Sequence, residues 1–187
     1  IGELQARRLA GTEGTGPPFW SPDSRYLGFA NESKLMKVDV TGAPPQPLCD
    51  VAEFHGGAWN SDDVIVFSSR GTGAEPPAAV VLLYRVSAAG GVPTEIARPD
   101  PTAPQTRYGR YVWPAFLPDG RHFLYLAWSA ERGKHAIYVG SLDGGPPTRL
   151  IDAALMAAYA PPGFLLYQRE GSLLAQAFDP GRLRLSD

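Results

Sequence analysis

The sequence predicts an all-β fold built from four-stranded antiparallel sheets that repeat along the chain. One phrase occurs four times in the 187 residues: an aromatic strand, a Pro/Asp turn, an apolar strand, an alternating strand, a Gly/Pro turn and a short outer strand. No part of the chain shows the 3.6-residue periodicity of a helix. Repeated four-stranded units without helices indicate a β-propeller, in which each unit forms one blade.

The spacing of the first turn in each unit supports this interpretation. Consecutive turns begin 39, 57 and 43 residues apart, at Ser21, Asn60, Leu117 and Ala160. A four-stranded blade spans roughly 40–45 residues, and we interpret the long interval as the same unit with insertions. The predicted blades are residues 15–52, 53–99, 100–152 and 153–187.

The strands of a blade differ as their positions require. Tyr26–Phe29 and Phe123–Leu126 are nearly continuous apolar runs, as expected for strands that neighbouring blades cover on both faces. Lys34–Val40 alternates only in part, as expected for a strand further from the axis. The aromatic residues that precede the first turns are predicted to pack between blades; they are Trp20, Trp59, Phe116 and Tyr159.

The turns carry residues with structural roles. Pro22 and Pro118 fix φ at an early turn position, and the side chains of Asp23 and Asp119 can accept hydrogen bonds from nearby backbone N–H groups. Gly144 and its neighbour supply positive φ in the second hairpin of the third blade. We therefore predict that these proline and aspartate residues stabilise turns and have no catalytic role.

The residues before the first blade also resemble part of a blade. Residues 6–10 are similar to Pro147–Ile151, the predicted outer strand of the third blade, so residues 1–14 are predicted to be the outer strand of a preceding blade with its linker. The fourth blade has an outer strand of its own at Arg182–Leu185, so this leading strand is not needed to close a ring of four. We expect four blades plus one strand from a ring of six or more; a closed four-bladed ring is the alternative.

Two stretches carry a family resemblance. Trp20–Phe29 and Phe116–Tyr125 resemble the TolB-like (WD40-like) propeller repeat, which joins a Ser-Pro-Asp-Gly turn to an apolar strand. Residues 18–187 fit this pattern, although Asn60–Asp63 departs from the turn motif. The succession of blades is similar to the C-terminal propeller of some bacterial serine/threonine protein kinases, which implies a periplasmic or extracellular location. The repeat is specific for the fold and carries little information on function.

Charge and composition argue against several classes of protein. Seventeen Lys and Arg against 19 Asp and Glu leave a formal charge of −2, whereas duplex binding requires clustered basic residues. No segment approaches the roughly 18–20 continuous apolar residues of a membrane span. Cys49 is the single cysteine, which excludes an internal disulfide and a thiolate metal cluster and suggests a small packing residue.

The sequence contains no motif for catalysis or metal binding. There is no Gly-x-Ser-x-Gly elbow, no Gly-rich phosphate loop and no kinase triplet. His55, His122 and His135 lack the spacing of metal ligands, and Asp62–Asp63 lies outside any EF-type loop. We therefore predict no catalytic residue, no metal and no cofactor, so the segment itself is not expected to be an enzyme.

The insertions fall on one side of the predicted propeller. The turns between first and second and between third and fourth strands share one face, which we call the short-turn face. The opposite, long-loop face carries the insertions Ser69–Val80, Pro99–Tyr111 and Ser129–His135, and loops lengthen where function requires it. Exposed Tyr, Trp and Arg dominate protein interfaces. We predict a recognition surface on the long-loop face that consists of Arg70, Arg107, Tyr108, Arg110, Tyr111, Trp128 and Arg132.

These observations favour a non-catalytic binding or scaffold propeller. Its partner would be a protein, a peptide or a small ligand, and the resemblance suggests the sensor or interaction region of a bacterial signalling protein such as a receptor-type kinase. Two alternatives stay open: the gating propeller of a prolyl oligopeptidase-like hydrolase, and a propeller enzyme that acts on sugars. Produced alone, the segment is expected to self-associate through exposed apolar blade flanks.

Overall fold

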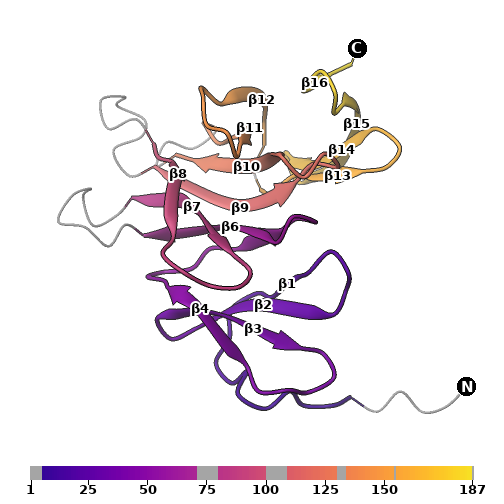
Figure 1. Cartoon of the computed structure of the whole chain (residues 1–187). Helices are drawn as coiled ribbons and strands as arrows, with labels where there is room; N and C mark the ends of the chain where they lie inside the picture. Colours follow the sequence, from indigo (N-terminus) through magenta and orange to yellow (C-terminus); the bar gives the residue numbers. More distant parts are fainter. Residues whose placement is uncertain (1–5, 71–79, 100–108, 130–133, 154, 187) are drawn as a thin grey trace, which may run out of the picture.

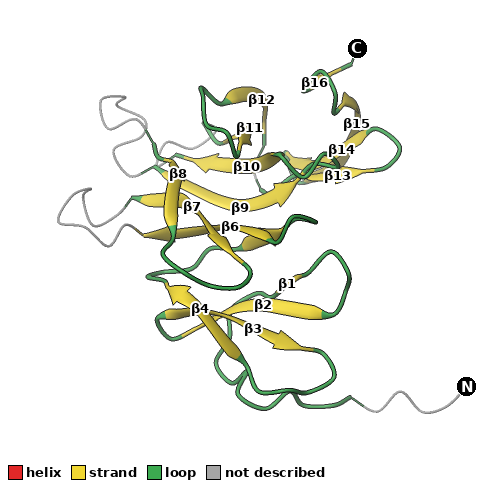
Figure 2. Ribbon diagram, in the orientation of Figure 1, coloured by secondary structure: helices red, strands yellow, loops and turns green. Residues whose placement is uncertain are grey.

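The computed structural model describes residues 6–70, 80–99, 109–129, 134–153 and 155–186, and these contain strands and no helix (Figure 2). The first two blades comprise β1 (Phe19–Trp20), β2 (Tyr26–Asn31), β3 (Lys34–Asp39), β4 (Gln46–Asp50), β5 (Gly57–Trp59), β6 (Val64–Arg70), β7 (Val81–Ser87) and β8 (Thr94–Ala97). The last two comprise β9 (Arg110–Phe116), β10 (His122–Trp128), β11 (Ala136–Ser141), β12 (Thr148–Asp152), β13 (Ala158–Ala160), β14 (Phe164–Arg169), β15 (Ser172–Asp179) and β16 (Arg184–Leu185).

Each group of four strands forms an antiparallel meander, which we number blades 1 to 4 in chain order. Strands β1 to β4 and strands β13 to β16 pair in sequence order as separate sheets. Blades 2 and 3 share one eight-stranded sheet, because Val81 at the start of β7 pairs in parallel with Arg110 at the start of β9. The predicted all-β propeller fold, with four-stranded antiparallel blades, is confirmed.

The blades stack face to face, and alternation along the strands supplies the core between them (Figure 1). In β6, Ile65 and Phe67 pack into the cluster shared with blade 1, whereas Val66 packs into the cluster shared with blade 3. In β10, Phe123 faces blade 2 and Leu124 faces blade 4. A strand that is covered on both faces has no side chain directed to solvent, which explains the continuous apolar runs in the sequence.

The repeated aromatic residues have different surroundings. Trp59 is 8% exposed and belongs to the core between blades 1 and 2. Phe116 and Tyr159 are partly buried against the cores on either side of blade 3. Trp20, in contrast, is 56% exposed, so the packing expected of it does not form.

Aspartate side chains close the first turns of blades 1 and 3 on the short-turn face. Asp23 Oδ1 accepts the backbone N–H of Arg25, and Asp119 Oδ1 accepts those of Arg121 and His122. The fourth residue of the blade 3 turn, Gly120, has a left-handed φ of 65°, a conformation that glycine adopts without steric cost. Side-chain acceptors and left-handed residues therefore keep these turns short.

The segment before blade 1 forms no strand in its described part, and the outer strand of a preceding blade expected at residues 6–10 stays a prediction. Residues 6–18 contain no strand and run across the outer face of blade 1, where Leu9 and Thr12 lie beside Phe29 and Val38. The side chain of Arg7 donates to the backbone carbonyl of Val40. A strand needs a sheet edge to pair with, and this segment lies over a sheet face, so it covers the apolar flank of blade 1 instead.

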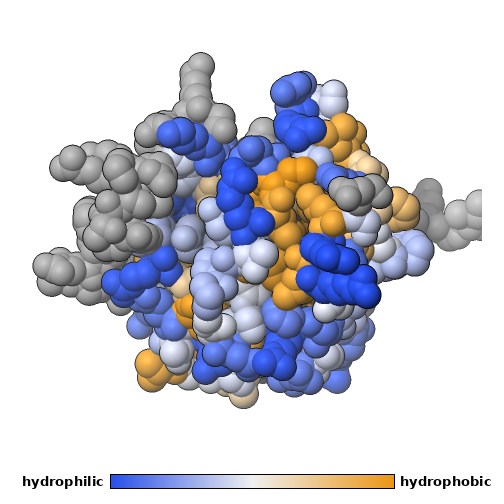
Figure 3. All heavy atoms as spheres, turned by 90° about the horizontal axis from the view of Figure 1, so that it is seen from above, coloured by the Kyte–Doolittle hydropathy of each residue, from blue (hydrophilic) through white to orange (hydrophobic). Residues whose placement is uncertain are grey.

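The opposite end of the stack is exposed. Alternate residues of blade 4 point away from blade 3, among them Phe164 and Leu173, which is 75% exposed. Figure 3 looks onto this end of the molecule and shows apolar surface beside hydrophilic patches. The sequence predicts two exposed apolar flanks. Residues before blade 1 cover the flank of that blade, whereas the flank of blade 4 carries exposed apolar side chains.

Cys49 lies in β4 and packs partly against the core between blades 1 and 2. Burial raises the pKa of its thiol to about 11, so the group is a neutral thiol near pH 7. Among the described residues, no helix has the length and apolar character needed to cross a membrane. The same part of the chain contains no group of three or more His, Cys, Asp or Glu that could hold a metal ion.

Candidate binding face

Sheet register brings three of the predicted recognition residues together on the long-loop face. Arg70 at the end of β6 pairs with Val81, Val81 pairs with Arg110, and Arg110 pairs with Trp128 at the end of β10. These residues are separated by long loops in the sequence but occupy adjacent positions at one end of the eight-stranded sheet. The parallel contact between β7 and β9 is therefore what assembles this face.

Glu53 organises the positive charge on this face. Its carboxylate lies 3.5 Å from Arg110 Nη1, 3.7 Å from Arg70 Nη1 and 3.1 Å from His55 Nε2. Glu53 has a left-handed φ of 55°, which a glutamate rarely adopts. One carboxylate therefore contacts two guanidinium groups and one imidazole.

Trp128 forms the aromatic part of the face. The guanidinium of Arg110 lies 5.7 Å from the centre of its ring, within the range of a cation–π interaction. The imidazole of His135 stacks on Trp128, with ring centres 5.4 Å apart and planes inclined by 16°. The indole is 37% exposed, so it remains accessible to a partner while its neighbours hold its orientation.

His135 is held in its neutral form. Its Nδ1 accepts the backbone N–H of Ser129 at 3.1 Å, which requires an unprotonated nitrogen. Burial lowers the pKa of His135 below its ordinary value, because desolvation disfavours the imidazolium ion. The aromatic pair of Trp128 and His135 is thus uncharged at neutral pH.

The structure places the other predicted residues differently. Tyr111 turns inward, with its ring centre 4.7 Å from that of Tyr125, because it alternates with Val112 along β9 and faces blade 2. Arg107, Tyr108 and Arg132 lie outside the described residues.

Sequence reasoning missed Glu53, His55 and His135 as members of this face. The three residues occur in connections between strands and belong to no repeat. The only sequence signal they share is their position beside the boundaries of strands that end on the long-loop face.

No protein-family model matches the chain, and no curated protein matches it. Solved structures do match. TolB from Acinetobacter baumannii superposes with a TM-score of 0.65 at 16% identity, over 88% of this chain and 41% of its own. The chain has the fold of a TolB-like β-propeller.

Two enzymes share this fold. A gluconolactonase from Xanthomonas campestris matches with a TM-score of 0.66 at 18% identity, over 92% of this chain and 60% of its own. An oligogalacturonate lyase in complex with manganese matches with a TM-score of 0.65 at 18% identity, over 90% and 51%. The chain spans 41–60% of the length of these three proteins. Such identities show the fold alone, which does not separate binding proteins from enzymes; the likeness to kinase propellers is not shown.

Proposed function

We propose that this segment is a non-catalytic recognition module whose long-loop face binds an acidic segment of a partner protein. The observation that carries the proposal is the position of Arg70 and Arg110 around the carboxylate of Glu53, beside the exposed ring of Trp128. Arg and Trp are the residue types enriched at interface hot spots. Two guanidinium groups next to an aromatic surface suit carboxylate side chains that alternate with apolar ones.

The charge geometry supports an anionic partner over a cationic one. The ion pairs of Glu53 with the two arginines are 3.5 and 3.7 Å long, and the arginine side chains are 37% and 44% exposed. Exposed pairs of this length contribute little stability, so the guanidinium groups can exchange partners at low cost. A planar guanidinium also binds an incoming carboxylate in bidentate geometry.

The test is fluorescence anisotropy with a labelled Asp/Glu-rich peptide that contains Leu and Trp, compared with a Lys-rich peptide. Arg110→Ala is expected to weaken binding of the acidic peptide by about tenfold, since a charge-assisted hydrogen bond contributes about 1.5–3 kcal/mol. Arg121→Ala is the matched control, because Arg121 pairs with Asp143 on the short-turn face and should leave binding unchanged. Equal binding of both peptides, or equal loss in both variants, would refute the proposal.

One alternative has structural support. A prolyl endopeptidase matches with a TM-score of 0.63 at 12% identity, over 89% of this chain and 27% of its own, which fits a propeller that gates an attached hydrolase domain. The flanking coding sequence decides between the two functions. A Gly-x-Ser-x-Gly domain would favour gating, and a kinase domain with a membrane span would favour the signalling role.

We also infer that this segment, when produced alone, self-associates through the exposed flank of blade 4. Phe164 and Leu173 are exposed on a sheet face that resembles the inner faces of the stack, and exposed apolar patches drive association. Light scattering after size-exclusion chromatography should show a mass that rises with concentration. Leu173→Glu should return the protein to a monomer, and a monomer at all concentrations in the unaltered protein would contradict the inference.

A further inference from the structure

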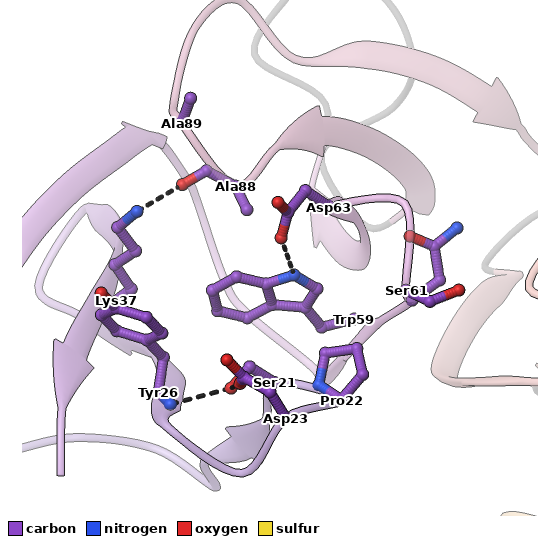
Figure 4. A pocket seen from close by; sticks show the side chains of 11 residues that line it. Ser21, Pro22, Asp23, Tyr26, Lys37, Trp59, Ser61, Asp63, Ala88 and Ala89 are labelled. Atoms are coloured by element: carbon purple, nitrogen blue, oxygen red, sulfur yellow. Dashed lines mark hydrogen bonds between the residues drawn. The ribbon is translucent and has the colours of Figure 1, made fainter.

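A cleft opens on the short-turn face between blades 1 and 2, away from the face discussed above (Figure 4). Its volume is about 630 Å³, within the roughly 300–1,000 Å³ range of small-molecule sites. The residues that line it come from the first turns of both blades, from β2 and β3, and from the turn after β7. They are Ser21, Pro22, Asp23, Tyr26, Lys37, Trp59, Asn60, Ser61, Asp63, Ala88 and Ala89.

The cleft exists because one turn position differs between blades. At the next junction, the side chain of Asn60 reaches across and its Nδ2 donates to the carbonyl of Gly120 at 2.7 Å, which ties the turns of blades 2 and 3 together. The equivalent residue in blade 1 is Ser21. Its shorter side chain is used within its own turn, where Oγ donates to Asp23 and accepts the backbone N–H of Tyr26, so the turns of blades 1 and 2 stay apart.

The floor of the cleft is aromatic. Tyr26 stacks on Trp59 with ring centres 6.1 Å apart and planes inclined by 26°. The indole is fixed in turn, since Trp59 Nε1 donates to Asp63 Oδ1 at 3.1 Å. Lys37 lies over the Tyr26 ring, with Nζ 5.3 Å from its centre, and donates to the carbonyl of Ala88 at 2.7 Å. Figure 4 shows these side chains converging on one space.

The cleft also offers unused donors and acceptors. Asp23 and Asp63 each use Oδ1 for hydrogen bonds within the protein, and among the described residues neither Oδ2 receives one. A hydrogen bond from Ser21 and one from the backbone of Arg25 lower the pKa of Asp23, so this group is ionised at neutral pH. Lys37 makes a single hydrogen bond, which leaves two of its N–H groups for a ligand.

The charges of the lining select among ligand classes. An anion would face the carboxylates of Asp23 and Asp63. A cation would have to approach Tyr26, beside which Lys37 and Arg25 already lie, each 5.3 Å from the ring centre. A neutral ligand with many hydroxyl groups avoids both repulsions, because each hydroxyl can donate to a carboxylate and accept from the ammonium group.

We propose that this cleft binds a neutral carbohydrate of one or two sugar rings. The C–H face of the sugar would lie against the parts of Tyr26 and Trp59 that line the cleft, and its hydroxyl groups would bond to Asp23, Asp63 and Lys37. The site needs no catalytic group, and it lies on the face opposite the proposed protein-binding surface. Failure of one proposal therefore leaves the other standing.

The test is saturation-transfer difference NMR with maltose, cellobiose and lactose, followed by glucose, glucosamine and glucuronic acid as a matched neutral, cationic and anionic set. Saturation is expected on the C–H protons of at least one neutral disaccharide, and glucose should bind more tightly than its two charged analogues. Absence of transfer to all neutral sugars, or tighter binding of either charged analogue, would overturn the proposal.

Substitutions in the cleft test whether the sugar binds there, and a control substitution in the same turn separates loss of binding from misfolding. Asp63→Asn is expected to weaken binding by about tenfold, through loss of a charge-assisted hydrogen bond. Asn tolerates the left-handed φ of 58° at this position and keeps an acceptor for Trp59. Asp62→Asn, in the same turn but outside the lining, is the matched control. Tyr26→Phe should keep binding and Tyr26→Leu should lose it; binding that survives both Asp63→Asn and Tyr26→Leu would place the sugar elsewhere.

Discussion

The side chain of Asn60 on the short-turn face and that of Glu53 on the long-loop face make different kinds of interaction. On the short-turn face, buried side chains such as Asn60 bond to backbone groups at 2.7–3.1 Å. On the long-loop face, the contacts are exposed ion pairs of 3.5–3.7 Å around Glu53 and a stacked pair of rings. Neutral buried bonds specify one geometry, whereas exposed charges exchange partners and respond to salt. The hydrogen bonds of Asn60 therefore stabilise the fold, and the ion pairs around Glu53 can exchange partners.

The largest effect is expected at Asn60. Asn60→Ala removes the bond to Gly120 and two turn bonds to the backbone N–H groups of Asp62 and Val64, at a position that is 4% exposed. Leaving buried backbone groups unpaired should lower the free energy of unfolding by about 2–4 kcal/mol.

Urea unfolding measures this loss, with Ser21→Ala as the matched control in blade 1. Because the hydrogen bonds that Ser21 makes with the described residues all lie within blade 1, its replacement should cost only about 1 kcal/mol. Equal losses of unfolding free energy in the two variants would show that the Asn60–Gly120 hydrogen bond does not add stability at the junction of blades 2 and 3.

Asp119 provides the second test of the short-turn face. Its Oδ1 accepts two backbone N–H groups, and its Oδ2 lies 2.6 Å from His122 Nδ1. Asp119→Ala should lower the free energy of unfolding by about 1–2 kcal/mol through loss of these acceptors. Asp143→Ala, at an exposed ion pair with Arg121, should change stability by less, and the reverse order would contradict the structural role of the turn.

Glu53→Gln tests the long-loop face and should barely affect folding. Removing one exposed carboxylate is expected to change the free energy of unfolding by less than about 1 kcal/mol. It also removes the internal competitor for Arg70 and Arg110, so binding of the acidic peptide should tighten, and the gain should vanish between about 0.05 and 1 M NaCl. Anisotropy at both salt concentrations measures this; weaker binding would show that Glu53 contacts the partner itself.

The smallest effect concerns pH and His135. Burial lowers the pKa of His135 in the folded protein, so the unfolded chain binds its proton more readily. Stability should therefore fall as pH drops through the ordinary histidine value of about 6.5 and level off below the lowered pKa. Melting temperatures at about pH 7.5 and 5.5 should differ less in His135→Asn than in the unaltered protein. An identical difference would assign the pH dependence to other groups.

The sequence predicted the features that repeat and missed those that do not. Turn residues such as Pro22 and Asp119 recur at one blade position, so the four meanders and both faces could be inferred. Residues 6–10 resemble an outer strand in composition, but strand formation depends on an edge to pair with, which no local pattern reveals.

The long-loop face and the cleft between blades 1 and 2 could likewise be predicted only in part from the sequence. Arg110 and Trp128 are predicted because they flank long insertions. Glu53 joins them because backbone hydrogen bonds hold its connection beside β6 and β9. The cleft depends on whether a side chain at an equivalent turn position spans the gap to the next blade, as Asn60 does and Ser21 does not. Whether a side chain spans the distance to the next blade depends on the three-dimensional spacing of the turns, which the sequence does not give.

The contact between Val81 and Arg110 has a consequence for how the molecule opens. It joins blades 2 and 3 into one continuous ladder. Blades 1 and 4 form separate sheets, and blade 1 is attached to blade 2 by side-chain packing and by hydrogen bonds such as that from the Gly91 N–H to the Leu48 carbonyl. Proteins lose structure in cooperative units that follow such boundaries. We expect amide protons of the two central blades to exchange with solvent together and most slowly, and those of the outer blades to exchange earlier, so that the long-loop face stays assembled while the ends of the stack fluctuate.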